Sequence, residues 1–341
     1  MLNTVYQLKA PRQFEVAFKD IELDQEHVIV RPTHLSICHA DQRYYQGTRP
    51  EEILRQKLPM ALIHEGIGTV VMDPTGSFRQ GDHVVMIPNA PVERDEIIAE
   101  NYLRSSKFCA SSKDGFMQEY VSLLPDRLVL LPEGINPIVA AFTEIVSVSY
   151  HAVSRFRRFA HSRRDVIGVW GDGNLGYITS LLLKKLLPDS RVLVFGRNHS
   201  KLNDFSFADE TYLVSEIPSE LTIDHAFECV GGMASSKAVN QIIDHIVPEG
   251  TIALLGVSED EVPINTRMVL EKGLHLYGSS RSGREDFVGL LKLYEENPDI
   301  VSYLENIVGS QFEVHTIADL VNAFETDIHK LIGKTVMVWK E

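Results

Sequence analysis

The sequence predicts a two-domain α/β protein in which an irregular, β-rich domain precedes a doubly wound parallel sheet. With 341 residues the chain is long for a single core, since a domain averages about 150 residues. From Val28 to Leu131, short apolar runs are separated by glycine, proline and aspartate, a pattern typical of short strands and turns. From Arg164 onward, strand-like runs alternate with helical stretches, which indicates a parallel sheet covered by helices. We expect a first domain of residues 1–147, completed by 300–341, and a second of residues 148–299.

A strand, a glycine turn and a helix open the second domain. Val166–Trp170 is a buried-strand run, the turn Gly171-x-Gly173-x-x-Gly176 follows, and Tyr177–Leu187 has helical length and apolar content. Later strands are expected at Arg191–Phe195, Asp224–Glu228 and Thr251–Leu255. This order of elements predicts a Rossmann domain.

The C-terminal tail returns to the first domain. Ile317–Phe324 is followed by the apolar segment Gly333–Trp339, which we expect to form a strand of the first domain's sheet. No internal repeat or low-complexity segment interrupts the chain.

The glycine turn predicts a dinucleotide site. In a strand–turn–helix setting such glycines hold a pyrophosphate at the helix N-terminus, whereas a glycine hexapeptide elsewhere is often only a loop. The residues assigned to the cofactor are His39, Gly171, Gly173, Asn174, Leu175, Gly176, Gly196, Arg197 and Lys201.

The end of the second predicted strand favours NADP(H). An NAD-binding domain has an acidic residue there for the ribose 2′-hydroxyl, but this chain reads Phe195-Gly196-Arg197-Asn198. Arg197 and Lys201 instead offer cations for a 2′-phosphate, and no carboxylate repels it. The alternative is that both are solvated cations at the start of a helix.

Three segments of the first domain carry residues that suit a catalytic zinc. Cys38 follows a strand-like segment, His64-Glu65 begins a glycine-punctuated strand, and Glu144 stands in an apolar segment where an uncompensated carboxylate would be costly. A thiolate, an imidazole and a carboxylate provide the three protein ligands of such a zinc, whose open position takes water or substrate. Taken singly, these residues have ordinary explanations: a buried cysteine, a satisfied core histidine and a salt-bridged glutamate.

The occurrence of this donor set ahead of a glycine turn indicates a zinc-assisted, nicotinamide-dependent dehydrogenase. We assign Cys38, His64 and Glu144 to the metal, with Glu65 either a fourth ligand or one that exchanges with water. Asp41 is a candidate hydrogen-bond acceptor for the ligand imidazole.

The composition limits the partners and the compartment. A net charge of -14 argues against nucleic acid, and no stretch approaches the roughly 18 apolar residues of a membrane span. Three widely spaced cysteines form no disulfide framework, and the N-terminus lacks a secretory pattern. We therefore expect a cytoplasmic protein with reduced thiols.

These motifs resemble the zinc-dependent medium-chain dehydrogenase/reductase superfamily from about Val28 to the C-terminus. A narrower resemblance, to the ribulose-5-phosphate reductases of the CDP-ribitol branch of teichoic-acid synthesis, covers most of the chain. The matching segments are Cys38-x-x-Asp41, Asp41–Gly47, Leu58–Glu65, His64-Glu65-x-x-Gly68-x-Val70, Gly81-Asp82-x-Val84, Ile87–Asn89, Glu144 and the glycine turn.

The resemblance implies a GroES-like catalytic domain, a Rossmann domain, one catalytic zinc and NADPH-dependent reduction of D-ribulose 5-phosphate to D-ribitol 5-phosphate. It also implies a homodimer and raises a cytidylyltransferase as a possible partner. The structural-zinc lobe of many relatives has four cysteines, but Pro88–Gly115 has only Cys109, so we expect no structural zinc. The proton-relaying hydroxyl two positions after the zinc cysteine is Ala40, which leaves zinc-bound water, acting through Glu144 or His39, as the proton source.

Basic residues after the metal cysteine are candidates for a substrate phosphate, with solvated surface charge as the rival explanation. The proposed substrate residues are Arg43, Tyr44, Arg49, Lys57, Arg281 and Arg284; the last two could also serve a cofactor phosphate.

Three other functions stay open. They are a polyol dehydrogenase acting on an unphosphorylated, sorbitol-like substrate, a zinc-free quinone-reductase-like enzyme and a catalytically idle protein on this fold, as lens crystallins are.

Overall fold

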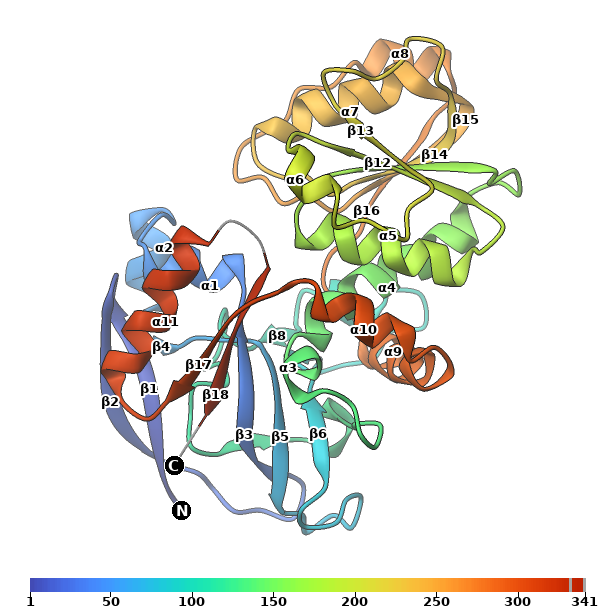
Figure 1. The fold of residues 1–341 in the computed structure, drawn as a ribbon. Coiled ribbons are helices and arrows are strands. Elements are labelled where there is room, and N and C mark those ends of the chain that lie inside the picture. The colour runs from blue at the N-terminus through green and yellow to red at the C-terminus, as the bar shows by residue number, and fades with distance from the viewer. Residues whose placement is uncertain (331–332, 340–341) are drawn as a thin grey trace. The chain divides into compact units, whose positions relative to one another are not determined.

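The computed structural model describes residues 1–330 and 333–339, which form two compact units (Figure 1). The first, the catalytic unit, comprises Met1–Ile145 and Ser282–Glu341, and the second, the nucleotide unit, comprises Val146–Arg281. The chain thus leaves the first unit once and returns to it. The domain boundaries expected from the sequence, after residues 147 and 299, remain predictions of where the chain divides into independently folding domains.

The catalytic unit is built mainly from antiparallel strands. Its central sheet has the order β10-β6-β5-β3-β18-β17, with β9 also paired to β3, and a smaller sheet has the order β2-β1-β4. The strands are β1 (Leu2–Ala10), β2 (Gln13–Asp20), β3 (Val28–Ile37), β4 (Met60–Ala61), β5 (Glu65–Met72), β6 (His83–Met86), β7 (Asn89–Ala90), β8 (Lys107–Phe108), β9 (Val121–Leu123), β10 (Leu128–Leu130), β17 (Val308–Val314) and β18 (Lys334–Trp339).

Helices accompany these strands. They are α1 (His39–Tyr45), α2 (Glu51–Lys57), α3 (Pro137–Ala140), α4 (Thr143–Phe159, which continues into the nucleotide unit), α9 (Arg284–Glu296), α10 (Asp299–Glu305) and α11 (Ile317–His329). None of the helices in the described residues is long and apolar enough to cross a membrane.

The nucleotide unit contains the expected parallel sheet, with helices between its strands. The strand order is β13-β12-β11-β14-β15-β16, so the first strand in sequence lies inside the sheet and the chain winds outward in both directions. This doubly wound order confirms the predicted fold class. The elements are β11 (Val166–Trp170), α5 (Asn174–Leu186), β12 (Arg191–Gly196), α6 (His199–Leu202), β13 (Glu210–Leu213), β14 (Ile223–Glu228), α7 (Ala234–His245), β15 (Ile246–Leu254), α8 (Thr266–Glu271) and β16 (His275–Gly278).

Strand β18 joins the C-terminal tail to the centre of the catalytic sheet. It pairs antiparallel with β3, with Thr335 opposite Ile37, and parallel with β17. The prediction that the tail rejoins the first domain is therefore confirmed for the described residues 333–339. Because β3 ends just before Cys38, the start of β18 lies beside that cysteine.

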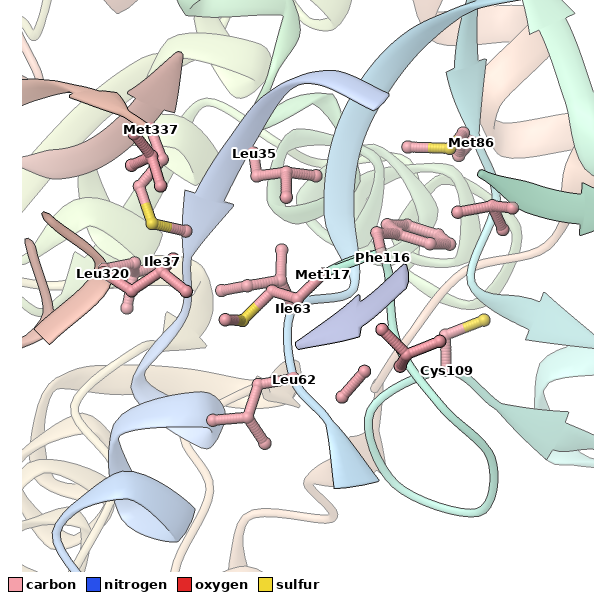
Figure 2. Close-up of a cluster of buried hydrophobic side chains, with 14 of the residues drawn as sticks. Leu35, Ile37, Leu62, Ile63, Met86, Cys109, Phe116, Met117, Leu320 and Met337 are labelled. Carbon is pink, nitrogen blue, oxygen red and sulfur yellow. The ribbon is translucent and has the colours of Figure 1, made fainter. Parts of the chain in front are cut away.

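The segment leading to His64 has an unusual backbone. Ile63 has φ +68°, a left-handed conformation that is rare for a β-branched residue. The side chain of Ile63 is buried in the hydrophobic core together with Phe116 and Met117 (Figure 2).

A neighbouring segment holds this conformation in place. The backbone N–H groups of Gly115, Phe116 and Met117 donate to the carbonyls of Ala61, Ile63 and Leu62, at 2.7, 2.7 and 3.3 Å. The two backbones approach so closely that a Cβ on Gly115 would lie 2.3 Å from the carbonyl oxygens of both Ile63 and Leu62. Position 115 therefore has room for glycine alone.

We expect Gly115→Ala to destabilise the protein by about 1–3 kcal/mol, as overpacking does, and to lower its affinity for zinc, because relief of the clash must move the backbone before His64. Gly278→Ala is the matched control, since nothing lies within 4 Å of the added methyl group. Denaturant unfolding and zinc titration of both variants check this, and equal behaviour of the two would contradict it.

Candidate functional site

The paired strands β3 and β5 bring three of the four predicted metal donors together in the catalytic unit. Cys38 follows β3 as the residue that caps α1, and His64 and Glu65 lie at the start of β5. The pairing of Ser36 with Glu65 places the two strand ends side by side. The donor atoms of Cys38, His64 and Glu65 all lie within 4.8 Å of one another, and no other group of three such donors is this close in the described residues.

The buried carboxylate of Asp41 holds two of these donors in place. One oxygen accepts the N–H of Ile63 at 3.0 Å, and the other accepts the N–H of Cys38 at 3.1 Å. The imidazole Nδ1 of His64 lies 3.5 Å from the first oxygen. Burial opposes a positive charge on His64, but Asp41 and the Cys38 thiolate outweigh it and raise the pKa of the imidazole well above its usual value. The site therefore favours positive charge.

Glu65 has a partner that the sequence analysis missed. Lys334, at the start of β18, places its Nζ 2.9 Å and 2.8 Å from the two carboxylate oxygens and also donates to the carbonyl of Ile37 at 2.9 Å. Glu65 is 0 % and Lys334 2 % exposed, so the pair is removed from water. Glu65 can reach a metal only by sharing or leaving this ion pair.

Glu144, in the first turn of α4, is the predicted donor that is not part of this close group. It is buried, and its pKa is raised to about 7, with burial as the largest cause. The charges of Glu65 and Asp41 contribute to this rise, whereas those of His64 and Lys334 oppose it. A carboxyl group in this position becomes a stable anion when a cation is near it.

The donor set fits a zinc ion. It combines a thiolate, an imidazole and carboxylates, the ligand types that zinc takes in catalytic sites. Asp41 faces the His64 imidazole at 3.5 Å, the position expected of an acceptor that orients a ligand imidazole. Cys109, by contrast, is buried in the hydrophobic core, and burial raises the pKa of its thiol.

In the nucleotide unit, the glycine turn connects β11 to α5. A Cβ on Gly176 would lie 1.9 Å from the carbonyl oxygen of Gly171, so this glycine permits the close packing of turn and helix. A Cβ on Gly173 would meet nothing within 4 Å, which leaves its surface open to a ligand. Asn174 and Leu175 form the first turn of α5. The geometry is that of a dinucleotide-binding turn.

Asp172, inside this turn, is a second residue that the sequence analysis missed. Its carboxylate accepts the N–H groups of Arg197 and Asn198, at 2.7 and 2.9 Å, and so fixes the turn after β12. Gly196 leaves room for it, because a Cβ there would lie 2.7 Å from the Cβ of Asp172. Arg197 is exposed at this turn, and Lys201 follows in α6.

The proposed substrate residues divide into separate groups. The guanidinium of Arg49 lies over the ring of Tyr44, 4.3 Å from its centroid, and Arg43 lies on the same helix as Tyr44. Lys57 lies in the last turn of α2.

Arg281 and Arg284 belong to different units. The Nη1 of Arg284 donates to the carbonyls of Asp126 and Leu128, both at 2.7 Å, which favours a structural role. Arg281 is exposed and has φ +56°. The assignment of either arginine to a phosphate stays a prediction.

Two family models match the chain. The alcohol dehydrogenase GroES-like domain matches residues 24–133, and the zinc-binding dehydrogenase domain matches residues 192–296. Among curated proteins, the ribulose-5-phosphate reductase of Bacillus spizizenii is 58 % identical over 340 residues, with both chains covered completely. Ribulose-5-phosphate reductase 1 of Staphylococcus aureus is 56 % identical, with 99 % of each chain covered.

Solved structures agree with these relatives. The crystal structure of S. aureus TarJ in complex with NADPH has a TM-score of 0.90 and 51 % identity, with both chains covered completely. L-idonate 5-dehydrogenase from Escherichia coli has a TM-score of 0.86 at 19 % identity, which shows the shared fold.

We expect about one zinc per chain, held through Cys38, because a single catalytic donor set is present. Cys38→Ser replaces a thiolate by a neutral hydroxyl and should remove most of the zinc and of the activity. Cys229→Ser is the control, since this buried thiol belongs to the nucleotide unit, where it contacts Thr179. Elemental analysis of dialysed protein checks the content; two tightly held ions per chain, or none in a fully active preparation, would be incompatible with this assignment.

Proposed function

The chain belongs to the ribulose-5-phosphate reductases of the zinc-dependent medium-chain dehydrogenase/reductase superfamily, and we propose that it reduces D-ribulose 5-phosphate to D-ribitol 5-phosphate with NADPH. The observation that carries this proposal is the 58 % identity to such a reductase over the full length of both chains. The product would feed CDP-ribitol synthesis for teichoic acid. A cytoplasmic location, a homodimer and a cytidylyltransferase partner stay predictions.

In this proposal Cys38, His64 and Glu144 hold the zinc. When bound, zinc supplies a Lewis acid for the C2 carbonyl, and NADPH supplies the hydride. Asp41 orients the imidazole of His64 and the backbone of Cys38, and Lys334 neutralises Glu65 so that this carboxylate adds little net charge to the site. Ala40 offers no hydroxyl, so a proton reaches the substrate oxygen from solvent by way of Glu144 or His39.

The turn after β12 is the proposed binding site of the cofactor's 2′-phosphate. Asp172 carries a negative charge, but its carboxylate is engaged by two backbone N–H groups, which reduces its repulsion of a phosphate. Arg197 and Lys201 are then the charges that the 2′-phosphate meets. The backbone at Gly196 is fixed, so Arg197 projects from a defined position.

The substrate phosphate is assigned to the arginines that follow the metal cysteine. Arg43 and Arg49 supply the positive charge, and Tyr44 supports Arg49 through the contact of its ring with the guanidinium. Cys38 is only five residues before Arg43, so the phosphate-binding groups and the metal donors lie on one short segment. A phosphorylated pentulose fits this combination.

We predict that Arg197→Ala raises the KM for NADPH about 10-fold or more and leaves the KM for NADH nearly unchanged. Loss of a charge-assisted hydrogen bond costs about 1.5–3 kcal/mol. Arg191→Ala is the control, because Arg191 is exposed at the opposite end of the same strand and pairs with Glu210. Steady-state kinetics with both cofactors checks this; an equal loss for NADPH and NADH would show that Arg197 does not read the 2′-phosphate.

The wild-type enzyme should reduce D-ribulose 5-phosphate far faster than D-ribulose or fructose. Arg43→Ala and Arg49→Ala should each narrow this preference about 10-fold without loss of zinc, since each removes one charged contact to phosphate. Arg55→Ala, at an exposed position of α2 paired with Glu51, should behave as wild type. Equal turnover of phosphorylated and neutral ketoses would instead favour a sorbitol-dehydrogenase-like activity.

A further inference from the structure

Helix α11 ends beside a buried ion pair. Lys330 follows the last helical residue, and its ammonium group pairs with the carboxylate of Asp327, one turn earlier. The Lys330 side chain is 23 % exposed and that of Asp327 is 4 % exposed. Burial lowers the pKa of Lys330, and the charge of Lys334 lowers it further. The lysine is thus held in a poorly hydrated place that already carries positive charge.

Helix α1, which carries the basic residues after Cys38, packs against this end of α11. The side-chain amide of Gln42 donates to the Asp327 carboxylate and to the Phe324 carbonyl, both at 2.9 Å. Arg43 lies on α1 next to Gln42, and the guanidinium of Arg49 lies over the ring of Tyr44 on the same helix. Basic groups from two separate parts of the sequence therefore gather around Asp327.

This cluster has unmet donors and an excess of positive charge. The Nε of Arg49 is buried, and no atom in the described part of the chain accepts its hydrogen bond. A buried donor of this kind needs an acceptor, and cations kept together in an acidic protein need an anion. A phosphate group satisfies both needs, because its oxygens accept several charge-assisted hydrogen bonds at once.

We propose that Lys330 joins His39, Arg43 and Arg49 in a phosphate subsite of the catalytic unit, in which Asp327 is the internal counter-ion that competes with the bound phosphate. This inference rests on the proposed function, since both the sugar phosphate and NADPH carry phosphate groups that this chemistry would recognise. Cys38 is the N-cap of α1, the helix that carries His39 and Arg43, so the subsite lies near the metal donors.

Inorganic phosphate is the probe, and isothermal titration of the full-length enzyme measures its affinity. Lys330→Met should weaken phosphate binding about tenfold or more, and Lys330→Arg should restore most of it. Asp327→Asn should strengthen binding, because the amide oxygen still accepts from Gln42 while the competing charge is gone. Lys292→Met is the matched control, since Lys292 is exposed on α9 and pairs with Glu296.

Two further measurements identify the source of the phosphate. A rise in the KM for D-ribulose 5-phosphate, with that for D-ribulose unchanged, assigns the subsite to the sugar; a rise in the Kd of NADPH, measured by fluorescence without substrate, assigns it to the cofactor. Either result supports the subsite. The subsite is overturned if Lys330→Met cannot be distinguished from Lys292→Met in any of these measurements. It is also overturned if Lys330→Met and Asp327→Asn lose thermal stability while their phosphate affinity is unchanged.

The proposed function and the phosphate subsite can fail independently of each other. If no form of the enzyme reduces D-ribulose 5-phosphate but Lys330→Met weakens phosphate binding, the function fails and the subsite stands. If the substrate is turned over but phosphate affinity is unchanged by Lys330→Met and Asp327→Asn, the subsite is contradicted and the proposed function stands. Should Lys330→Met not fold, Asp327→Asn carries the test, and unchanged phosphate affinity in that variant overturns the subsite.

Discussion

The catalytic unit depends on the two oxygens of one buried carboxylate, that of Asp41. They accept the N–H groups of Cys38 and Ile63, which precede or follow different strands, and one of them also faces the imidazole of His64. Removal of this carboxylate would leave two buried backbone donors without acceptors, at a cost of about 1–3 kcal/mol each. It would also remove one of the hydrogen bonds that hold the left-handed backbone at Ile63, the residue before His64. The position of the metal donors is thus set by an aspartate that is not itself assigned to the metal.

Charge balance is the second constraint on this site. Asp41, Glu65 and Glu144 are all buried near the Cys38 thiolate, a concentration of negative charge that burial makes costly. Lys334 offsets one of these charges and comes from the last strand of the chain. The return of the tail to the catalytic sheet therefore completes the electrostatics of the site as well as the sheet. A bound zinc ion would supply the remaining positive charge.

The features that could be predicted from the sequence are those that local patterns encode. The strand Val166–Trp170 and the glycine turn were expected where they occur, because a buried run, the turn residues and a helix follow one another directly. Asp41 was expected as a hydrogen-bond acceptor for the His64 imidazole. The ion pair of Glu65 with Lys334 joins residues far apart in the sequence, and it arises from the register of β18 against β3, which no local pattern specifies. A lysine at the head of a buried strand was the available signal.

Other parts of the site depend on backbone geometry. Ile63 is an ordinary apolar residue in the sequence, and no sequence pattern indicates its positive φ. Asp172 accepts from backbone groups in the turn after β12. The contact of Gln42 with Asp327 requires the packing of α11 on α1.

Diffraction at the zinc absorption edge, from crystals of the active enzyme with D-ribulose 5-phosphate bound, tests the central claim most directly. The account predicts one anomalous peak per chain, in bonding contact with the Cys38 thiolate and the His64 imidazole and beside C2 of the sugar, with Glu65 still paired to Lys334. An active crystal without a peak at Cys38, or with the sugar bound away from that peak, would contradict it.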